Sequence, residues 1–136
     1  MIGVLIIAHG SLGQSLIDCA THVMGNRPGQ LDYLEISNSD DPSLMLPKAQ
    51  ALVKSLDTGQ GVLVLSDIYG ATPCNIVTRL LTPDETEGVA GVNLPMLVRV
   101  LNYRHEGLHA CIDKALSGGR DGVVHFTKTT CHHTQQ

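Results

Sequence analysis

Apolar residues along this chain fall into short continuous runs that alternate with stretches of helical spacing. The run at residues 2–8 is uncharged and almost entirely aliphatic, which is typical of a strand buried on both faces of a parallel sheet. The run at 61–66 has the same character. The pattern predicts five strands, at residues 2–8, 31–36, 61–66, 88–93 and 121–126.

Between these runs, apolar residues recur every three or four positions, as expected for helices with one buried face. The first predicted helix opens on Ser11, which has a capping-box spacing from Gln14, and it stops at Gly25. The third has Thr72 as its N-cap and Pro73 as its first helical residue. The pattern predicts five helices, which begin at Ser11, Asp41, Thr72, Pro95 and Leu108.

Proline and glycine modify two of these helices. Pro47 lies inside the second, where a proline shifts the start of a helix or kinks it. Gly118 and Gly119 come late in the last helix, where they are expected to stop it. Strands and helices that alternate at this length favour an α/β fold with an open, mostly parallel sheet, the doubly wound arrangement.

The length of 136 residues is enough for one domain and too short for two ordinary ones. We assign residues 1–128 to this domain and interpret 129–136 as a polar, loose tail. The N-terminal apolar run lacks a preceding basic region and is interrupted at His9, so it does not resemble a secretion signal. No apolar stretch approaches the roughly 18–20 residues of a membrane-spanning helix. We therefore expect a cytoplasmic protein, at most peripheral to a membrane.

Charge and composition exclude several classes of function. The net charge is −4, and the nine Lys and Arg residues form no basic run, so nucleic acid is not an expected partner. Aromatic residues make up 3% and Trp is absent, which leaves no platform for stacking bases or sugar rings. The four cysteines are widely spaced without a C-x-x-C pair, so free thiols are expected.

Two predicted strand ends carry residues suited to chemistry. His9 follows the first strand and Asp67 follows the third, and functional groups of open α/β sheets gather beyond the carboxyl ends of the strands. Each residue leads through a glycine into the N-terminus of a helix, where free N–H groups and the helix dipole favour an anion. The candidate phosphate-binding residues are Gly10, Ser11, Gly70, Ala71 and Thr72.

Phosphoryl transfer through histidine fits this arrangement. A neutral imidazole attacks with one ring nitrogen only when the other nitrogen holds the proton. A carboxylate that accepts this N–H fixes the tautomer, orients the ring and stabilises the developing positive charge. We predict that His9 is the nucleophile and that Asp67 orients it. Thr72 either gives its hydroxyl to a phosphate oxygen or only caps its helix.

Each of these residues also has a structural interpretation. A single histidine after a strand is often structural or merely exposed, and aspartate is a common turn residue at a strand end. Thr72 as a plain N-cap and Gly70 as a turn residue need no ligand. The joint placement of these residues at two strand ends is what favours function.

Three segments of the chain resemble a known family. They are IGVLIIAHGSLGQSLIDCA at 2–20, GVLVLSDIYGATPCN at 61–75 and VAGVNLPMLVRVL at 89–101. Together they are similar to the mannose-family IIA components of the bacterial phosphoenolpyruvate-dependent sugar phosphotransferase system (PTS). The resemblance covers about the first hundred residues in the order and spacing of that family, whereas the last 35 match loosely.

The resemblance implies a fold and a site. The family fold is a four-stranded parallel sheet with an added C-terminal antiparallel strand, here near 121–126, which members exchange in a homodimer. The phosphorylated histidine of the family matches His9, its orienting aspartate matches Asp67, and its small hydroxyl residue matches Thr72. The loop containing Asn93, Pro95 and Met96 corresponds to the rim where partners dock.

The resemblance also implies partners. The histidine-containing phosphocarrier protein gives the phosphoryl group, and a IIB component receives it; since no IIB domain is fused here, that component is a separate protein. Standalone members also serve regulation in bacteria without a sugar permease. Neither a cofactor nor a metal is expected. Asp67 is followed by Ile-Tyr-Gly, where transport members often have an aromatic residue and two glycines, so the sugar is left open.

Three alternatives remain beside the phosphocarrier interpretation. The start Ala-His-Gly-Ser also resembles a small tetrapyrrole metal chelatase with His9 as metal ligand, although the sequence has no histidine between His22 and His105. Cys131-His132-His133 adds metal-binding side chains to the tail. A phosphohistidine phosphatase would surround the phosphate with arginines, and the nearest in sequence to His9 is Arg27. A non-catalytic interaction module, with a structural His9, is the third.

Overall fold

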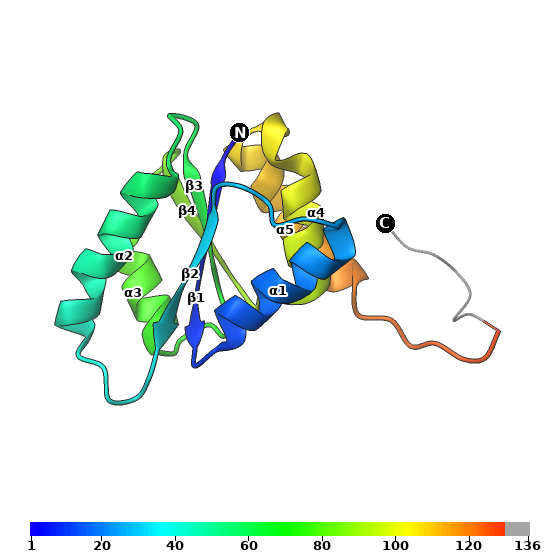
Figure 1. Cartoon of the computed structure of the whole chain (residues 1–136), viewed down its shortest axis with the longest axis horizontal. Coiled ribbons are helices and arrows are strands. Elements are labelled where there is room, and N and C mark those ends of the chain that lie inside the picture. The colour runs from blue at the N-terminus through cyan, green and yellow to red at the C-terminus, as the bar shows by residue number, and fades with distance from the viewer. Residues whose placement is uncertain (130–136) are drawn as a thin grey trace.

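The computed structural model describes residues 1–129 as one sheet between two layers of helices (Figure 1). The strands are β1 (Gly3–His9), β2 (Leu31–Ile36), β3 (Val62–Ser66) and β4 (Thr86–Ala90). The helices are α1 (Leu12–Met24), α2 (Pro42–Leu56), α3 (Thr72–Leu80), α4 (Leu94–Tyr103) and α5 (Leu108–Asp121), with a 3-10 turn at Arg104–Glu106. This alternation confirms the predicted α/β fold.

The four strands form one parallel sheet in the order β2-β1-β3-β4. The strand pairs β1–β2, β1–β3 and β3–β4 are all parallel, so the carboxyl ends of all four strands lie along the same edge. In Figure 1 this edge is at the bottom, where β1 turns into α1. The order reverses between β1 and β3, which makes the space beyond these two strands the switch point of the sheet.

Each face of the sheet has its own apolar core. Helices α1, α4 and α5 cover one face, and α2 and α3 cover the other (Figure 1). Residues 4–8 of β1 and 62–65 of β3 are completely buried, because both faces of these central strands are covered. The continuous apolar runs of the sequence therefore predicted the two strands that position the site.

Two predicted helix starts differ in detail from the structure. Ser11 is the N-cap of α1, but its side chain makes no capping hydrogen bond, so the expected capping box is not formed. Ala71 is the N-cap of α3 and Thr72 its first helical residue, one position away from the prediction. The start of α2 follows the prediction, since the Asp41 side chain accepts from the Ser43 N–H. Pro47 lies inside α2 and does not shift its start, which was one of the two effects expected of it.

The end of the chain differs more. The glycine pair does not stop α5, which continues to Asp121, and β4 covers 86–90 rather than 88–93. The expected strand at 121–126 is not formed: residue 121 is helical, and 123–127 have no regular structure. A strand needs a neighbouring strand for its backbone hydrogen bonds, and residues 123–127 pair with none of the strands within residues 1–129.

Gly118 and Gly119 lie inside α5, where α4 packs closely against them. A Cβ added at Gly118 would lie 3.0 Å from the Arg99 Cβ, and one added at Gly119 would lie 2.8 Å from the Met96 Cε. These two glycines therefore permit close helix packing instead of ending the helix. The predicted tail at 129–136 lies, apart from its first residue, outside the described residues. No described helix is both long and apolar enough to span a bilayer.

Candidate functional site

Adjacent strands bring His9 and Asp67 together. Ile7 of β1 is paired with Ser66 of β3, and His9 and Asp67 follow within two positions at the carboxyl edge. The His9 Nδ1 lies 2.7 Å from the Asp67 Oδ2, and the His9 backbone N–H donates to the same oxygen at 2.9 Å. The prediction that these two residues meet is confirmed by this geometry.

Asp67 is held at both carboxylate oxygens. Its Oδ1 accepts from the backbone N–H of Ile68 at 2.9 Å, while its Oδ2 accepts from His9. Burial opposes the charge and raises the pKa of the carboxyl, but the hydrogen bonds from His9 and Ile68 and the charge of His9 outweigh it. The net effect is an Asp67 pKa below its usual value, so the group is a carboxylate at neutral pH.

This contact fixes the tautomer of His9. A carboxylate only accepts hydrogen bonds, so the proton of the neutral ring belongs on Nδ1, and Nε2 carries the lone pair. The His9 side chain is 42% exposed, whereas that of Asp67 is 13% exposed. The ring is therefore held at Nδ1 by Asp67, and the exposed part of the ring is open to an incoming group.

The loop after β1 supplies the first of the predicted phosphate-binding residues. Gly10 has a positive φ of 54° and donates its N–H to the Ile36 carbonyl at 2.9 Å, so this amide is already used. The Ser11 hydroxyl makes no hydrogen bond within residues 1–129 and is exposed at the start of α1. The first amides of α1 lack partners inside the helix, as at any helix N-terminus.

The loop after β3 supplies the others. Gly70 has a φ of 87°, a conformation that favours glycine, and a Cβ there would meet nothing within 4 Å. Ala71 and Thr72 begin α3, and the exposed Thr72 hydroxyl makes no hydrogen bond to another described residue. Thr72 is therefore not the helix cap that one interpretation required, and its hydroxyl is available to a ligand.

The loop after β4 reaches the same edge. The Ser66 carbonyl accepts from the N–H groups of Gly91 and Val92 at 2.9 and 3.0 Å, which ties this loop to the end of β3. The predicted rim residues differ in exposure: Pro95 is exposed, Asn93 is partly buried, and Met96 is 4% exposed. Met96 therefore packs in the core and offers little surface to a partner.

The two hydrogen bonds that Asn93 makes were not predicted from the sequence. Its Oδ1 accepts from the Met96 N–H at 2.9 Å and caps α4, while its Nδ2 donates to the Gly119 carbonyl of α5 at 3.1 Å. An Asn two residues before a proline is an N-cap signature, so the sequence held the signal for the first bond. The Ile68 N–H that binds Asp67 was missed too, and a backbone donor leaves no trace in residue types.

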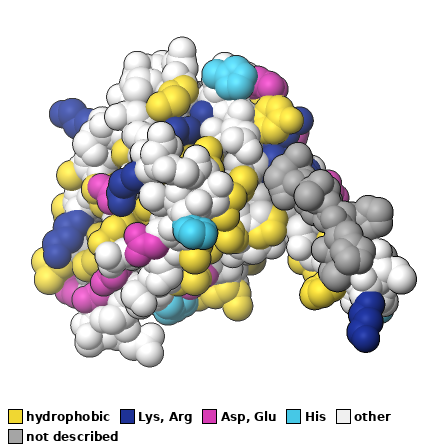
Figure 2. All heavy atoms as spheres, turned by 45° about the vertical axis from the view of Figure 1, so that its right-hand side comes forward, with side chains coloured by type: hydrophobic (Ala, Val, Ile, Leu, Met, Phe, Trp, Pro, Cys, Tyr) yellow, Lys and Arg dark blue, Asp and Glu magenta, His cyan; other side chains and the backbone are white. Residues whose placement is uncertain are grey.

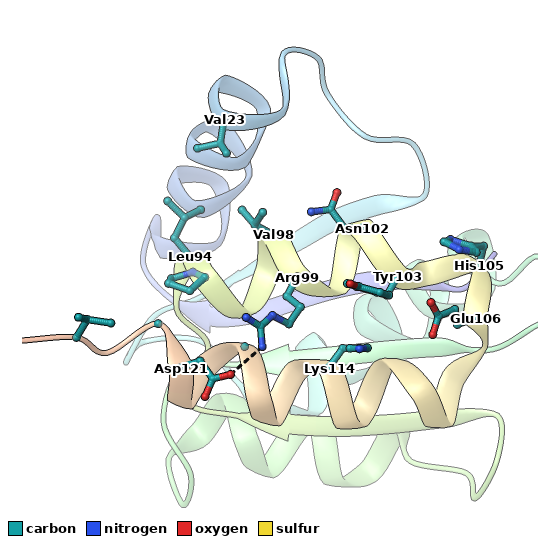
Figure 3. A pocket seen from close by; sticks show the side chains of 14 residues that line it. Val23, Leu94, Val98, Arg99, Asn102, Tyr103, His105, Glu106, Lys114 and Asp121 are labelled. Carbon is teal, nitrogen blue, oxygen red and sulfur yellow. Dashed lines mark hydrogen bonds and ion pairs between the residues drawn. The ribbon is translucent and has the colours of Figure 1, made fainter. Parts of the chain in front are cut away.

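One hollow among the described residues lies away from His9 and Asp67. It measures about 780 Å³ and opens between the end of α1, α4, α5 and the start of the C-terminal segment (Figure 3). Leu94, Val98 and Val124 contribute apolar surface, and an Arg99–Asp121 ion pair of 3.0 Å crosses one side. Neither His9 nor Asp67 lines this hollow, and the His9 side chain is exposed at the edge of the sheet.

Metal-binding side chains are not clustered in the described part of the chain. Among residues 1–129, no group of three or more His, Cys, Asp or Glu side chains is placed to hold a metal ion. Cys131, His132 and His133 lie outside the described residues.

A family model matches most of the chain. Residues 3–116 match the model described as "PTS system fructose IIA component", which includes both His9 and Asp67. The fold, the histidine–carboxylate edge and this match define the class of protein as a component of the phosphotransferase system.

Individual relatives narrow the class. The chain is 32% identical over 127 residues to the PTS system mannose-specific EIIAB component of Escherichia coli (strain K12), covering 90% of this chain and 38% of that protein. It is 30% identical over 105 residues to the PTS system fructose-specific EIIA component of Bacillus subtilis (strain 168), covering 76% and 71%. A crystal structure of EIIA from Streptococcus agalactiae has a TM-score of 0.82 at 24% identity, covering 96% and 100%, and shares the fold. The chain belongs to the mannose-family IIA components of the phosphotransferase system.

Proposed function

We propose that the chain is a phosphocarrier that is phosphorylated on Nε2 of His9. The observation that carries this proposal is the 2.7 Å contact between the His9 Nδ1 and the Asp67 carboxylate, at an edge where the ring remains open. A partly buried, hydrogen-bonded carboxylate on Nδ1 leaves the opposite nitrogen, Nε2, as the nucleophile. Membership of the IIA family supports the same role.

The transfer step follows from this geometry. The Nε2 lone pair attacks the phosphorus of a phosphohistidine on the donor protein; the new N–P bond forms as the donor's N–P bond breaks, and the donor imidazole leaves with its electron pair. The His9 ring becomes cationic, keeps its Nδ1 proton, and is stabilised by Asp67. The helix N-termini of α1 and α3, with the Ser11 and Thr72 hydroxyls, supply donors for the phosphoryl oxygens.

We propose the histidine-containing phosphocarrier protein as the donor. The acceptor is a IIB component or a regulatory target, and the exchange takes place in the cytoplasm. The mannose-specific relative from Escherichia coli is named an EIIAB component, and this chain spans 38% of its length. This supports a two-step relay in which the chain provides the first acceptor histidine.

We further propose that the chain forms a homodimer by exchanging the segment after α5. Val123, Val124 and Phe126 are exposed in a segment that leaves the body of the domain (Figure 2). β4 is an edge strand whose outer side is bridged by Thr82 at Thr86, and residues 121–126 of a second copy can add beyond this bridge as an antiparallel strand. Deleting residues 123–136 should convert a dimer into a monomer in sedimentation equilibrium; a dimer that survives the deletion would contradict the exchange.

The phosphocarrier role is tested by labelling. The chain, incubated with phosphoenolpyruvate, enzyme I and the phosphocarrier protein, should take up one acid-labile phosphate per chain, and His9→Ala should take up none. His109→Ala provides a matched control, because His109 also contacts a carboxylate but lies at the other edge of the sheet. Labelling that persists in His9→Ala would reject the proposal, and so would the absence of label in the unmodified protein.

A further inference from the structure

The peptide group that leads into Asp67 is fixed at its carbonyl oxygen. This oxygen belongs to Ser66, which is 2% exposed, and it accepts from the N–H groups of Gly91 and Val92 at 2.9 and 3.0 Å. Because a peptide group is planar, the Ser66 carbonyl and the Asp67 Cα belong to one rigid unit. Two donors on that carbonyl therefore help to orient the backbone from which the Asp67 side chain projects.

The loop that supplies these donors is anchored by its last residue. It comprises residues 91–93 between β4 and α4, and Gly91 has a φ of 89°, in the left-handed region that favours glycine. The Asn93 Oδ1 accepts from the Met96 N–H at 2.9 Å, and its Nδ2 donates to the Gly119 carbonyl at 3.1 Å. One side chain therefore ties the loop to the start of α4 and to the last turn of α5.

The bond to Gly119 depends on where α5 ends. In a longer helix the Gly119 carbonyl would accept from the N–H of Val123, four residues further on. That N–H donates to the Arg120 carbonyl instead, at 3.2 Å. The Gly119 carbonyl needs a donor from outside the helix, because an unpaired carbonyl in a partly buried place costs free energy. The amide of Asn93 supplies this donor.

We propose that Asn93 is a positioning residue for phosphoryl transfer, which acts on the Asp67 carboxylate through the loop after β4 and the Ser66 carbonyl. This role rests on the proposed phosphorylation of His9. Both ends of the Asn93 amide bind within the chain, so its contribution is internal to the domain. Without the amide, the loop is released from α5, and the 2.7 Å contact between the Asp67 Oδ2 and the His9 Nδ1 loosens.

Asn93→Ser tests this role without removing the helix cap. Serine is a good N-cap, so α4 keeps its capping bond, but no amide remains to reach Gly119. Phosphoramidate reports the reactivity of His9 without a protein surface: the new Nε2–P bond forms as the N–P bond of phosphoramidate breaks, and ammonia leaves with the electron pair. We expect the rate constant with phosphoramidate to fall about tenfold. The kcat/KM with the phosphocarrier protein should fall by the same factor, through kcat.

The tautomer of His9 gives a second readout that needs no phosphoryl donor. The two ring nitrogens give separate signals in a nitrogen NMR spectrum, and each signal reports whether that nitrogen carries the proton. The unmodified protein should show the neutral ring with its proton on Nδ1. In Asn93→Ser the two signals should move toward each other, because a less firmly placed Asp67 holds this tautomer less strongly.

Asp57→Ala is the matched control. Asp57 also holds a loop next to β3, because its Oδ1 accepts from the N–H groups of Gly59 and Gly61 at 2.8 and 3.1 Å. That loop precedes β3, at the amino edge of the sheet. The substitution should lower the free energy of unfolding, while the transfer rate and the nitrogen signals of His9 stay as in the unmodified protein.

Three outcomes would overturn the proposed role of Asn93. The first is an unchanged rate with phosphoramidate in Asn93→Ser; together with a raised KM for the protein donor, it would assign Asn93 to docking. The second is a slower rate with unchanged nitrogen signals, which would mean that Asp67 is not displaced. The third is an equal fall in Asp57→Ala, which would indicate general destabilisation. No label from either donor in the unmodified protein would instead reject the proposed function, and the nitrogen signals would still test the effect of Asn93 on Asp67.

Discussion

Among residues 1–129, two histidine–aspartate pairs have the same contact distance in very different surroundings. At the carboxyl edge of the sheet, the His9 Nδ1 lies 2.7 Å from Asp67; near the amino edge, the His109 Nε2 lies 2.7 Å from Asp84. The Asp67 side chain is 13% exposed and bound by three donors, whereas Asp84 and His109 are 77% and 71% exposed. Distance alone does not distinguish them.

The comparison shows what turns a contact into a site. The Asp67 carboxylate is fixed by backbone N–H groups, so it can orient the His9 ring, while two helix N-termini provide donors for an anion nearby. The exposed pair at Asp84 and His109 is shared with water, which weakens its electrostatic effect. Burial and backbone hydrogen bonds therefore distinguish the two pairs.

The largest effect is expected from removing the carboxylate of Asp67. Asp67→Asn should slow phosphoryl transfer to His9 about a hundredfold, because the amide no longer holds the Nδ1 proton in the reactive tautomer. Asp84→Asn should leave the rate within about twofold of the unmodified protein, as expected for an exposed pair remote from the transfer. Single-turnover transfer from the phosphocarrier protein measures both rates, and equal rates in the two variants would remove the distinction.

The pH dependence of the free energy of unfolding should also show how strongly the Asp67 carboxylate is held. Because the Asp67 pKa is lowered below its usual 3.8, the carboxylate stabilises the fold above that value, and this contribution is lost as pH falls through the folded-state pKa. Asp67→Asn has no such group, so its free energy of unfolding should fall less below pH 3.8 than that of the unmodified protein. Urea unfolding at a series of pH values gives the two slopes, and parallel curves would argue against a strongly held carboxylate.

A glycine substitution in each region should separate strain from function. Gly70 and Gly59 have φ values of 87° and 99°, and a Cβ at either would meet nothing within 4 Å. Alanine at either position should therefore cost about 1 kcal/mol of unfolding free energy from backbone strain alone. Only Gly70→Ala should also slow transfer, because Gly70 lies in the loop that connects Asp67 to α3. A transfer rate lowered equally by Gly59→Ala would show that the effect is general destabilisation.

The smallest effect is expected within the exposed pair. A double-mutant cycle of Asp84→Asn and His109→Gln should give a coupling free energy of about 0.5 kcal/mol or less, and salt should reduce it. Thermal or urea unfolding of the four proteins provides the cycle. A coupling well above 1 kcal/mol that resists salt would mean that exposure is a poor guide to the strength of these pairs.

The sequence predicted the parts of the protein that depend on local pattern. The runs at 2–8 and 61–66 identified the central strands, because strands buried on both faces need continuous apolar residues. Once these strands are adjacent and parallel, His9 and Asp67 meet at one edge. The contact between His9 and Asp67 was therefore predictable from two strand ends and the parallel order of the sheet.

The parts that depend on distant contacts were not predictable from local pattern. The apolar residues Val123, Val124 and Phe126 resemble a strand, yet this segment pairs with no strand of the described chain. Gly118 and Gly119 resemble a helix stop, but α4 packs against them and the helix continues. In each case the local sequence pattern fits both structures, and contact with a distant segment of chain decides which of them forms.

The two contacts between Asp67 and His9 affect what happens when two proteins meet. The backbone N–H and the ring Nδ1 of His9 both contact one carboxylate oxygen, so folding has already restricted the ring to one orientation. Partners that meet by diffusion remain together only briefly before they separate. A ring that needs no rotamer search within that interval makes a larger fraction of collisions productive.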